Sequence, residues 1–381
     1  MILIPILLAH LLLLANLRFE AWPEMLVYPY LLDHGFKLYQ DIINPYAPIF
    51  TGFLYFFFKV FGLSLSNLKL LTWGIIFASD IIIYRIASRR YGHIAGLLAL
   101  SFFVIFQPLL DGNGLWYDLA LTPVLLLAFD RQSPFLVAVA FFMKQSVLWL
   151  FVILFKKWRQ LLISLISLFL ISYFLFLVSG NLAAYLFWPW HFALTIMPTM
   201  PGHKDWGTPG LWFMALIPFI LPTLLWLRHR RFNSPEPFLW MSLSFLLILP
   251  RFGLFHLQPA LAFTALVLAQ HSRKIPKLFL ACYIVISSFL WFRHIKLFWH
   301  QPTRFFEPEI MQAAEKLKSF TVPEKPILFL NAPDQIMILA NRLPAKPWAI
   351  TFPWYLELPG MQQRFIDALI NQQVQAIVFS P

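Results

Sequence analysis

Three of the four acidic side chains in a short segment near the start of the chain could act as proton acceptors. Glu20 and Glu24 lie four residues apart, and Asp41 follows a turn at Gly35. Pro23 suits the first turn of a helix and Gly35 suits a C-terminal cap, so we expect a short surface helix between them. An alcohol is hardly ionised at neutral pH, so its attack on an electrophile needs a base such as a carboxylate. Glu20, Glu24 and Asp41 are therefore candidate catalytic bases.

A second set of charged side chains lies at breaks between apolar segments further along the chain. Lys144 interrupts the otherwise apolar stretch 134–155, and Arg251 and His256 lie five residues apart between two later apolar runs. Arg suits bidentate contacts with phosphate, whereas Lys acts as a point charge. Lys144, Arg251 and His256 are therefore candidates for binding a phosphate group. Asp111, at the start of the segment DGNGLWYD, is a fourth candidate catalytic carboxylate.

Each of these residues also has a purely structural explanation. An acid in an outer loop is usually only solvated, and Arg251 with His256 could bind lipid headgroups nonspecifically. Lys144 is harder to explain in this way, because a hairpin in the membrane gains no stability from a charge. His203 and Asp205 could bind a metal ion, but two ligands are too few to define a site. The sequence therefore supports no metal site and no cofactor, although a divalent ion would be compatible with the chemistry.

The composition indicates the kind of scaffold that positions these side chains. Of the 381 residues, 60% are apolar and only 12% are charged, which is roughly half the charged share of a soluble domain. Apolar runs long enough for the ~20 residues that cross a bilayer recur as far as Trp299. The net charge of +12 does not indicate nucleic-acid binding, because the basic residues form short clusters between apolar runs. We predict an all-α polytopic membrane protein, and the single Cys282 excludes a disulfide framework.

The basic clusters predict the orientation of the chain in the membrane. They are Arg89 with Arg90, Arg131, Lys156 with Lys157 and Arg159, Arg228 with Arg230 and Arg231, and Arg273 with Lys274. The positive-inside rule places them in the cytoplasm. The predicted spans are then 1–18, 67–87, 92–110, 117–129, 134–143, 146–155, 160–178, 211–227, 237–250, 257–270 and 276–298. The first stretch lacks a basic n-region and a cleavage site, so we interpret it as a retained span rather than a signal peptide.

Two segments fit this scheme only as short membrane elements. Residues 50–63 are apolar enough to insert, but a full span there would place Arg89 outside, so we expect a juxtamembrane or re-entrant helix. The stretch 134–155 is too short for two full spans, so we expect a tilted hairpin with Lys144 at its outer tip. The total is about 11–12 membrane helices, including this hairpin.

Of the ten carboxylates before residue 299, only Asp80 is placed in the interior of a predicted span. Such groups are costly in the membrane and are often functional. Tyr84 follows one helical turn later and Arg85 is next to it, so a local polar pair is the simpler interpretation.

The composition changes near His300, which divides the chain into two predicted domains. Residues 1–298 form a transmembrane domain with an acidic first outer loop at 19–66, and residues 299–381 form a small α/β domain outside the membrane. The strands of this domain are predicted at 326–331 and 375–380, and its amphipathic helices at 309–319 and 361–373. It carries no glycine-rich nucleotide motif and no cluster of His or Cys, so we assign it no chemistry.

The order of these motifs resembles the GT-C superfamily of polyprenyl-phosphate-sugar-dependent glycosyltransferases. The branch that it resembles contains protein mannosyltransferases and lipid A aminoarabinose transferases. The resemblance rests on Glu20 or Glu24 after the first span, then Gly35, Tyr39 to Asp41, Pro45 and Pro48, DGNGLWYD from Asp111, the tip at Lys144 and Gln145, PRFGLFHLQP from Pro250, and the α/β tail. The usual start in this family is an Asp-Glu pair, whereas this chain has Phe19 and Glu20, so which acid is functional stays open.

This resemblance implies transfer of a hexose or pentose from a polyprenyl-phosphate-linked donor to a hydroxyl of a lipid, glycan or protein. The reaction would take place at the outer face of the cell membrane, with the C-terminal domain extracytoplasmic and a carboxylate of the first loop as base. The competing interpretation is a polytopic transporter or lipid-sugar flippase. Transporters usually carry midplane charges and paired broken helices, and the sequence shows neither clearly. A membrane anchor for the tail would leave the acidic first loop unexplained.

Overall fold

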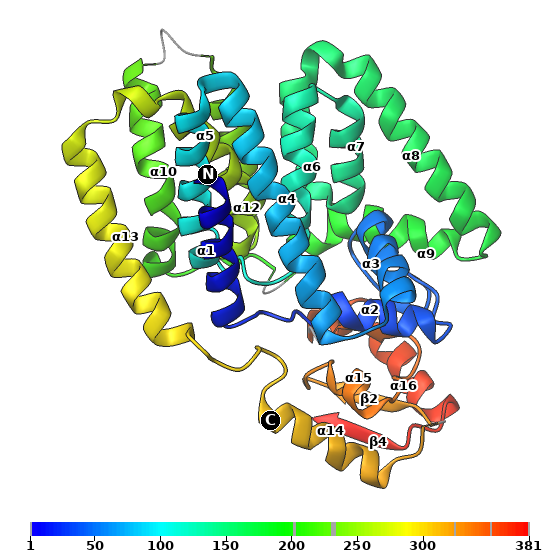
Figure 1. Cartoon of the computed structure of the whole chain (residues 1–381). Coiled ribbons are helices and arrows are strands. Elements are labelled where there is room, and N and C mark those ends of the chain that lie inside the picture. The colour runs from blue at the N-terminus through cyan, green and yellow to red at the C-terminus, as the bar shows by residue number, and fades with distance from the viewer. Residues whose placement is uncertain (1, 201–202, 230–233, 324, 351–352, 380–381) are drawn as a thin grey trace. The chain divides into compact units, whose positions relative to one another are not determined.

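The structure, a computed structural model, describes residues 2–200, 203–229, 234–323, 325–350 and 353–379 (Figure 1). Arg230 and Arg231 of one predicted cytoplasmic cluster lie outside these residues. The chain folds into two compact units. One comprises Met1–Phe19, Lys69–Leu168 and Asp205–Gln301, and the other comprises Glu20–Leu68, Phe169–Lys204 and Pro302–Pro381. The predicted domain boundary after residue 298 stays a prediction.

The first unit is built from apolar helices. They are α1 (Leu3–Asn16), α4 (Leu65–Tyr91), α5 (His93–Phe106), α6 (Tyr117–Arg131), α7 (Pro134–Met143), η2 (Gln145–Lys157), α8 (Trp158–Val178), α10 (Pro209–His229), α11 (Glu236–Phe245), α12 (Gln258–Gln270) and α13 (Lys277–Phe298), of which α4 and α8 extend into the second unit. Within the described ranges, four helical stretches are long and apolar enough to cross a membrane: Leu65–Tyr91, Gln145–Val178, Pro209–His229 and Leu280–Phe298. Several shorter apolar helices accompany them, among them α1, α5 and α7.

The core of this unit surrounds α12. Twelve consecutive residues from Gln258 to Ala269 are buried, and the helix packs against α5, α6, α10 and α11. A helix that is apolar on all sides is stable only where other helices surround it. Helix α12 therefore holds the segment that precedes it in a fixed position.

The helix α13 presents large apolar side chains outward. Phe289 is 67% exposed and Phe292 is 72% exposed. In water, such a continuous apolar face would promote aggregation, whereas lipid tails solvate it without cost. These faces are consistent with a protein that lies in a bilayer.

The predicted hairpin at 134–155 is present, but its second arm continues further than we expected. The helix α7 packs against η2, and Lys144 between them is extended, with φ −152° and ψ 120°. The predicted spans 146–155 and 160–178 form one helical stretch, Gln145–Val178, which bends where Leu154 leaves helical geometry. The basic cluster at 156–159 does not end the helix, because long basic side chains can reach water from a helix surface.

The second unit combines the first loop with the tail. Its helices are α2 (Glu24–Asp33), α3 (Pro48–Phe61), α9 (Leu182–Leu186), η3 (Phe187–Ile196), α14 (Pro308–Phe320), α15 (Ile336–Ala340) and α16 (Met361–Asn371). Its strands are β1 (Ile42–Ile43), β2 (Ile327–Leu330), β3 (Trp348–Ala349) and β4 (Ala376–Phe379). The strand β1 pairs in parallel with β3, and β2 pairs in parallel with β4. The β1–β3 pair therefore joins the loop to the tail.

The sequence predicted most elements of this unit. The strands β2 and β4 match the two expected strands, except that Ser380 lies outside the described residues, and α14 and α16 match the two expected helices. Helix α2 begins after Pro23 and is followed by Gly35 with φ +78°, as the capping pattern indicated. It differs from an exposed surface helix, because Glu24 to Leu31 are all buried. At 14 residues, α3 is shorter than the ~20 residues of a span.

Candidate functional site

A buried cluster of three charged or polar side chains lies in the first unit. Lys144 donates a hydrogen bond of 2.5 Å from Nζ to Oδ2 of Asp118, and Nδ1 of His256 lies 2.6 Å from the same oxygen. Nζ of Lys144 and Nδ1 of His256 are 3.0 Å apart. Asp118 is fully buried, and Lys144 and His256 are 6% and 7% exposed. Three segments distant in sequence thus meet at one carboxylate oxygen.

Each member of the cluster stands at the end of an element. Asp118 is in the first turn of α6, where a carboxylate interacts favourably with the helix dipole. Lys144 is the single extended residue between α7 and η2. His256 is in the short helix η7 (Leu254–Leu257), directly before α12. Because α6 and α12 pack against each other, the ends of these helices fix the cluster.

The charges within the cluster largely balance. The Lys144 ammonium and the Asp118 carboxylate form an ion pair, and a buried ion pair is tolerated only where further hydrogen bonds satisfy it. A positive charge on His256 would lie 3.0 Å from the ammonium nitrogen and would be repelled. A neutral imidazole with its proton on Nδ1 satisfies the contact with Asp118. Lys144 is therefore already engaged by a carboxylate, a pairing that was not predicted from the sequence.

Arg251 borders this cluster on an extended segment. Its backbone pairs with that of Asp205, and the amide of Phe252 donates to the Asp205 carbonyl oxygen at 2.7 Å. Arg251 is exposed, unlike Lys144 and His256. The arrangement places an accessible guanidinium five residues before His256 in the same connection between α11 and α12.

The segment DGNGLWYD contains residues with different tasks. Asp111 ends the short helix η1 (Pro108–Leu110) in a left-handed conformation with φ 51°, which Asp adopts more readily than most residues. Nδ2 of Asn113 donates to the carbonyl oxygens of Leu14 and Leu17 at 2.9 and 3.1 Å, and Oδ1 accepts from Trp73. Asn113 therefore caps the C-terminal end of α1. The last Asp of the segment, Asp118, belongs to the buried cluster.

The acids of the first loop lie in the second unit, and two of them pair with basic residues of the tail. Oε2 of Glu20 accepts a hydrogen bond of 3.0 Å from Arg304, and Glu20 is 6% exposed. Oδ2 of Asp41 accepts a hydrogen bond of 3.1 Å from Lys346. Glu24 is buried in the first turn of α2. These ion pairs tie the loop to the tail.

The comparisons with known proteins show the fold. The chain is similar to the crystal structure of ArnT from Cupriavidus metallidurans bound to undecaprenyl phosphate, with a TM-score of 0.65 and 12% identity over 99% of this chain and 89% of that one. The apo structure of the same protein gives the same TM-score and identity and is covered over 92%. This chain has a GT-C fold. The predicted all-α polytopic membrane architecture is thereby confirmed. No protein-family model and no curated protein sequence matches the chain.

Within this GT-C fold, the structure brings some predicted site residues together and leaves others apart. Lys144 and His256 meet, with Arg251 on the connection that carries His256. Glu20 and Asp41 share one unit but have separate basic partners. Among the described residues, no three His, Cys, Asp or Glu side chains form a group that could hold a metal ion.

Asp118 was not among the site residues predicted from the sequence. A signal for it existed, because a lysine in an apolar hairpin needs an acidic partner to be stable there. Asp118 stands at the start of an apolar helix, as Lys144 stands at the end of one. A search for opposite charges at the ends of apolar helices would therefore have suggested Asp118 as the partner of Lys144.

Proposed function

We propose that this protein transfers a sugar from a polyprenyl-phosphate-linked donor to a hydroxyl group. The observation that carries the proposal is the GT-C fold, shared over 99% of the chain with an ArnT structure that holds undecaprenyl phosphate. The buried charged cluster between the ends of apolar helices supports it, because a purely structural membrane bundle has no need of such a group.

In the proposed reaction, a carboxylate of the first loop takes the proton of the acceptor hydroxyl. The hydroxyl oxygen bonds to the anomeric carbon of the donor sugar, and the bond between that carbon and the phosphate oxygen breaks. Polyprenyl phosphate leaves with the bonding electrons. Glu20, Glu24 and Asp41 are the candidate bases, and Asp111 is a further candidate carboxylate. A positioned base contributes about 10²–10⁴-fold to such a step.

Positive charge must stabilise the phosphate as it leaves. Arg251 is the proposed direct contact, because its side chain is exposed and its guanidinium can bind two phosphate oxygens at once. Lys144 and His256 would act next to it, with Asp118 holding the Lys144 ammonium in place. As the leaving phosphate gains charge, the attraction to Lys144 and Arg251 increases, and this favours the transition state over the bound donor.

We place the proposed reaction at one face of the membrane and leave three classes of acceptor open. The basic clusters favour a cytoplasmic position for the end of α4 at Arg89 and for the helical segment around Lys157. The first loop and the tail would then be extracytoplasmic, and the reaction would take place at the outer face. A lipid, a glycan or a protein could supply the hydroxyl.

A lipid-sugar transporter or flippase is the second candidate, and one observation favours it. Nδ1 of His10 lies 2.8 Å from Oδ2 of Asp80, and Nε2 lies 3.3 Å from Oε1 of Gln107. His10, Asp80 and Gln107 are fully buried within the helical core. Buried ionisable groups in membrane helices often serve proton or ion pathways.

Purification in detergent followed by mass spectrometry of bound lipid tests the proposal. We expect polyprenyl phosphate or its glycosylated form to co-purify, and purified protein to convert a defined donor to free polyprenyl phosphate when an acceptor is present. A flippase would bind the lipid but leave the bond between sugar and phosphate intact. Protein that neither binds nor consumes such a lipid would contradict both functions.

A further inference from the structure

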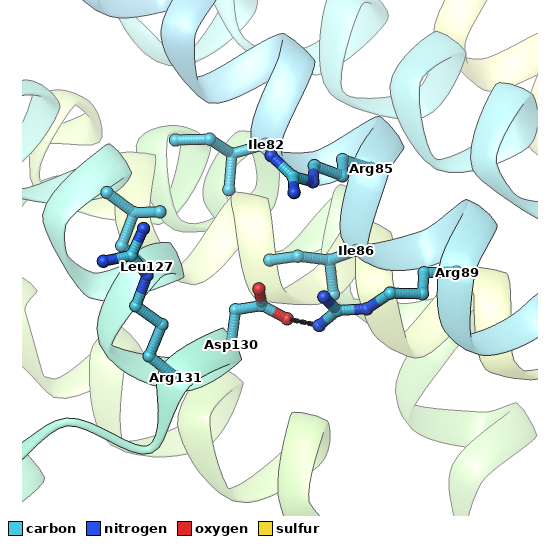
Figure 2. A pocket seen from close by; sticks show the side chains of 7 residues that line it. All are labelled: Ile82, Arg85, Ile86, Arg89, Leu127, Asp130 and Arg131. Carbon is cyan, nitrogen blue, oxygen red and sulfur yellow. Dashed lines mark hydrogen bonds and ion pairs between the residues drawn. The ribbon is translucent and has the colours of Figure 1, made fainter.

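A cavity of about 250 Å³ lies in the first unit between α4 and α6. Ile82 and Ile86 of α4 and Leu127 of α6 form its apolar walls. Three arginines and one aspartate complete the lining, as Figure 2 shows: Arg85, Arg89, Asp130 and Arg131. The volume is below the ~300–1,000 Å³ of pockets that enclose whole drug-sized ligands, so the cavity suits a single polar headgroup.

The charges that line this cavity do not balance. Arg89 donates a hydrogen bond to the Asp130 carboxylate. Across the part of the chain that the structure describes, the side chains of Arg85 and Arg131 make no hydrogen bond and no ion pair. Guanidinium groups stay protonated at any physiological pH. The lining therefore carries a net charge of +2, because it contains three guanidinium groups and one carboxylate.

The usual roles of basic residues at a helix end do not account for this arrangement. Arg89 and Arg131 stand in the last turns of α4 and α6, where a positive charge interacts favourably with the helix dipole. Arg85 lies one turn earlier, and it brings a third guanidinium to the same cavity. Like charges gathered around one carboxylate repel each other, and an anion in the cavity would remove that repulsion.

The cavity is distinct from the candidate active site. Asp118 begins α6 and Asp130 is near its end, and twelve residues at ~1.5 Å each place them about 18 Å apart along the axis. The positive-inside rule predicts that the end with Arg89 and Arg131 faces the cytoplasm. The phosphate layer of that leaflet would lie at the same depth as the cavity. On α4, the residue before Ile82 of the lining is Ile81, which is 52% exposed and could contact an acyl chain.

We propose that this cavity is a binding site for a phosphate group, carried either by the headgroup of an anionic lipid or by a soluble phosphate compound. Arg85 and Arg131 bind the phosphate oxygens, and Ile82, Ile86 and Leu127 contact the adjoining carbon chain. Arg89 remains paired with Asp130 and closes the site. Arginine suits this role because its planar fork can bind two phosphate oxygens together.

Native mass spectrometry of the full-length protein in detergent tests the proposal. The probes are phosphatidylglycerol and phosphatidylcholine, with glycerol 3-phosphate as the soluble arm. The test variant is Arg85→Gln/Arg131→Gln, and the matched control is Arg273→Gln, which removes an exposed arginine from another predicted cytoplasmic loop. The test variant removes no internal ion pair, and equal thermal unfolding midpoints verify that it folds.

We expect the double variant to bind phosphatidylglycerol at least tenfold more weakly, while Arg273→Gln binds it as the unaltered protein does. Preference for phosphatidylglycerol over phosphatidylcholine assigns the phosphate to an anionic lipid. Binding of glycerol 3-phosphate with the same arginine dependence, and no lipid preference, assigns it to a soluble compound. Arg85→Lys/Arg131→Lys keeps the charge and loses the fork, so intermediate binding is expected. Equal losses in the double variant and the Arg273 control, or no loss in either, would overturn the proposal.

Discussion

The carboxylate of Asp118 accepts a hydrogen bond of 2.5 Å from Nζ of Lys144, and both side chains are buried although 26 residues separate them. His256, a further 112 residues along the chain from Lys144, contacts both. The pair connects the first turn of α6 to the tip of the α7–η2 hairpin. Removal of either partner leaves a charge buried without its counter-charge, which is far more costly than removal of the pair.

Loss of Lys144 alone should therefore destabilise the protein strongly. We expect Lys144→Met to reduce the free energy of unfolding by about 3–5 kcal/mol. Asp118→Asn/Lys144→Met should recover much of this stability, because it leaves no unpaired charge. Denaturant unfolding in detergent micelles measures both variants. A double variant less stable than Lys144→Met would show that the two residues do not act as a pair.

Lys144→Met and Asp118→Asn/Lys144→Met also distinguish a structural role of Lys144 from a catalytic one. If Lys144 assists the leaving phosphate, the double variant should fold and still turn over slowly, because the positive charge is absent. Initial-rate assays on protein with verified folding measure this. Recovery of activity together with stability would confine Lys144 to a structural role.

The first-loop acids can be tested against their own ion-pair partners. At least one of Glu20→Gln, Glu24→Gln and Asp41→Asn should reduce turnover by about 10²–10⁴-fold with normal expression. Glu20 pairs with Arg304 and Asp41 pairs with Lys346, which provides matched controls.

For a catalytic base, loss of the acid should reduce turnover much more than Arg304→Gln or Lys346→Gln does. For a structural acid, the two losses should match, because either one breaks the same ion pair. Near-normal turnover in all three acid variants would place the catalytic base outside the first loop.

Arg251 is proposed to bind the donor phosphate through two hydrogen bonds. Arg251→Lys keeps the charge and removes the planar fork. We expect the KM for the donor to rise about tenfold or more, since a hydrogen bond to a charged group contributes about 1.5–3 kcal/mol. Steady-state kinetics with varied donor concentration check this, with Arg273→Lys as control. An unchanged KM would remove Arg251 from the phosphate site.

Within the motif DGNGLWYD, we expect Asn113 to contribute to stability and Asp111 to contribute to the reaction. Asn113→Ala removes the donor to the carbonyl oxygens at the end of α1 and should cost about 1–3 kcal/mol of stability. Asp111→Asn should leave stability unchanged and lower turnover if Asp111 takes part in the reaction. Paired measurements of unfolding and turnover test both residues. The opposite result, an unstable Asp111→Asn and an inactive but stable Asn113→Ala, would reverse the assignment.

The sequence correctly predicted those structural elements that depend on local sequence patterns. Apolar runs predicted the helices, the break at Lys144 predicted the hairpin, and Pro23 with Gly35 predicted the limits of α2. These features depend on hydrophobic period and on the conformational limits of single residues. They need no knowledge of which helices are neighbours.

The partners of buried polar groups could not be predicted in this way. Asp80 was expected to interact with Tyr84 or Arg85 one turn away, and that expectation was wrong, because Asp80 bonds to His10 of α1. Tyr84 instead bonds to His93. Helical spacing gives only the neighbours on the same helix, whereas the packing of α1, α4 and α5 selects the actual partners.

The proposed reaction moves a sugar from a polyprenyl phosphate to a hydroxyl group. Its most direct test is to supply purified protein with a donor that carries isotopic labels on both sugar and lipid, in the presence of an acceptor extract. We expect labelled polyprenyl phosphate and a labelled glycoside to appear in equal amounts, and Arg251→Gln to reduce both together. Intact donor, with its lipid and sugar labels still joined on either side of a reconstituted membrane, would contradict it.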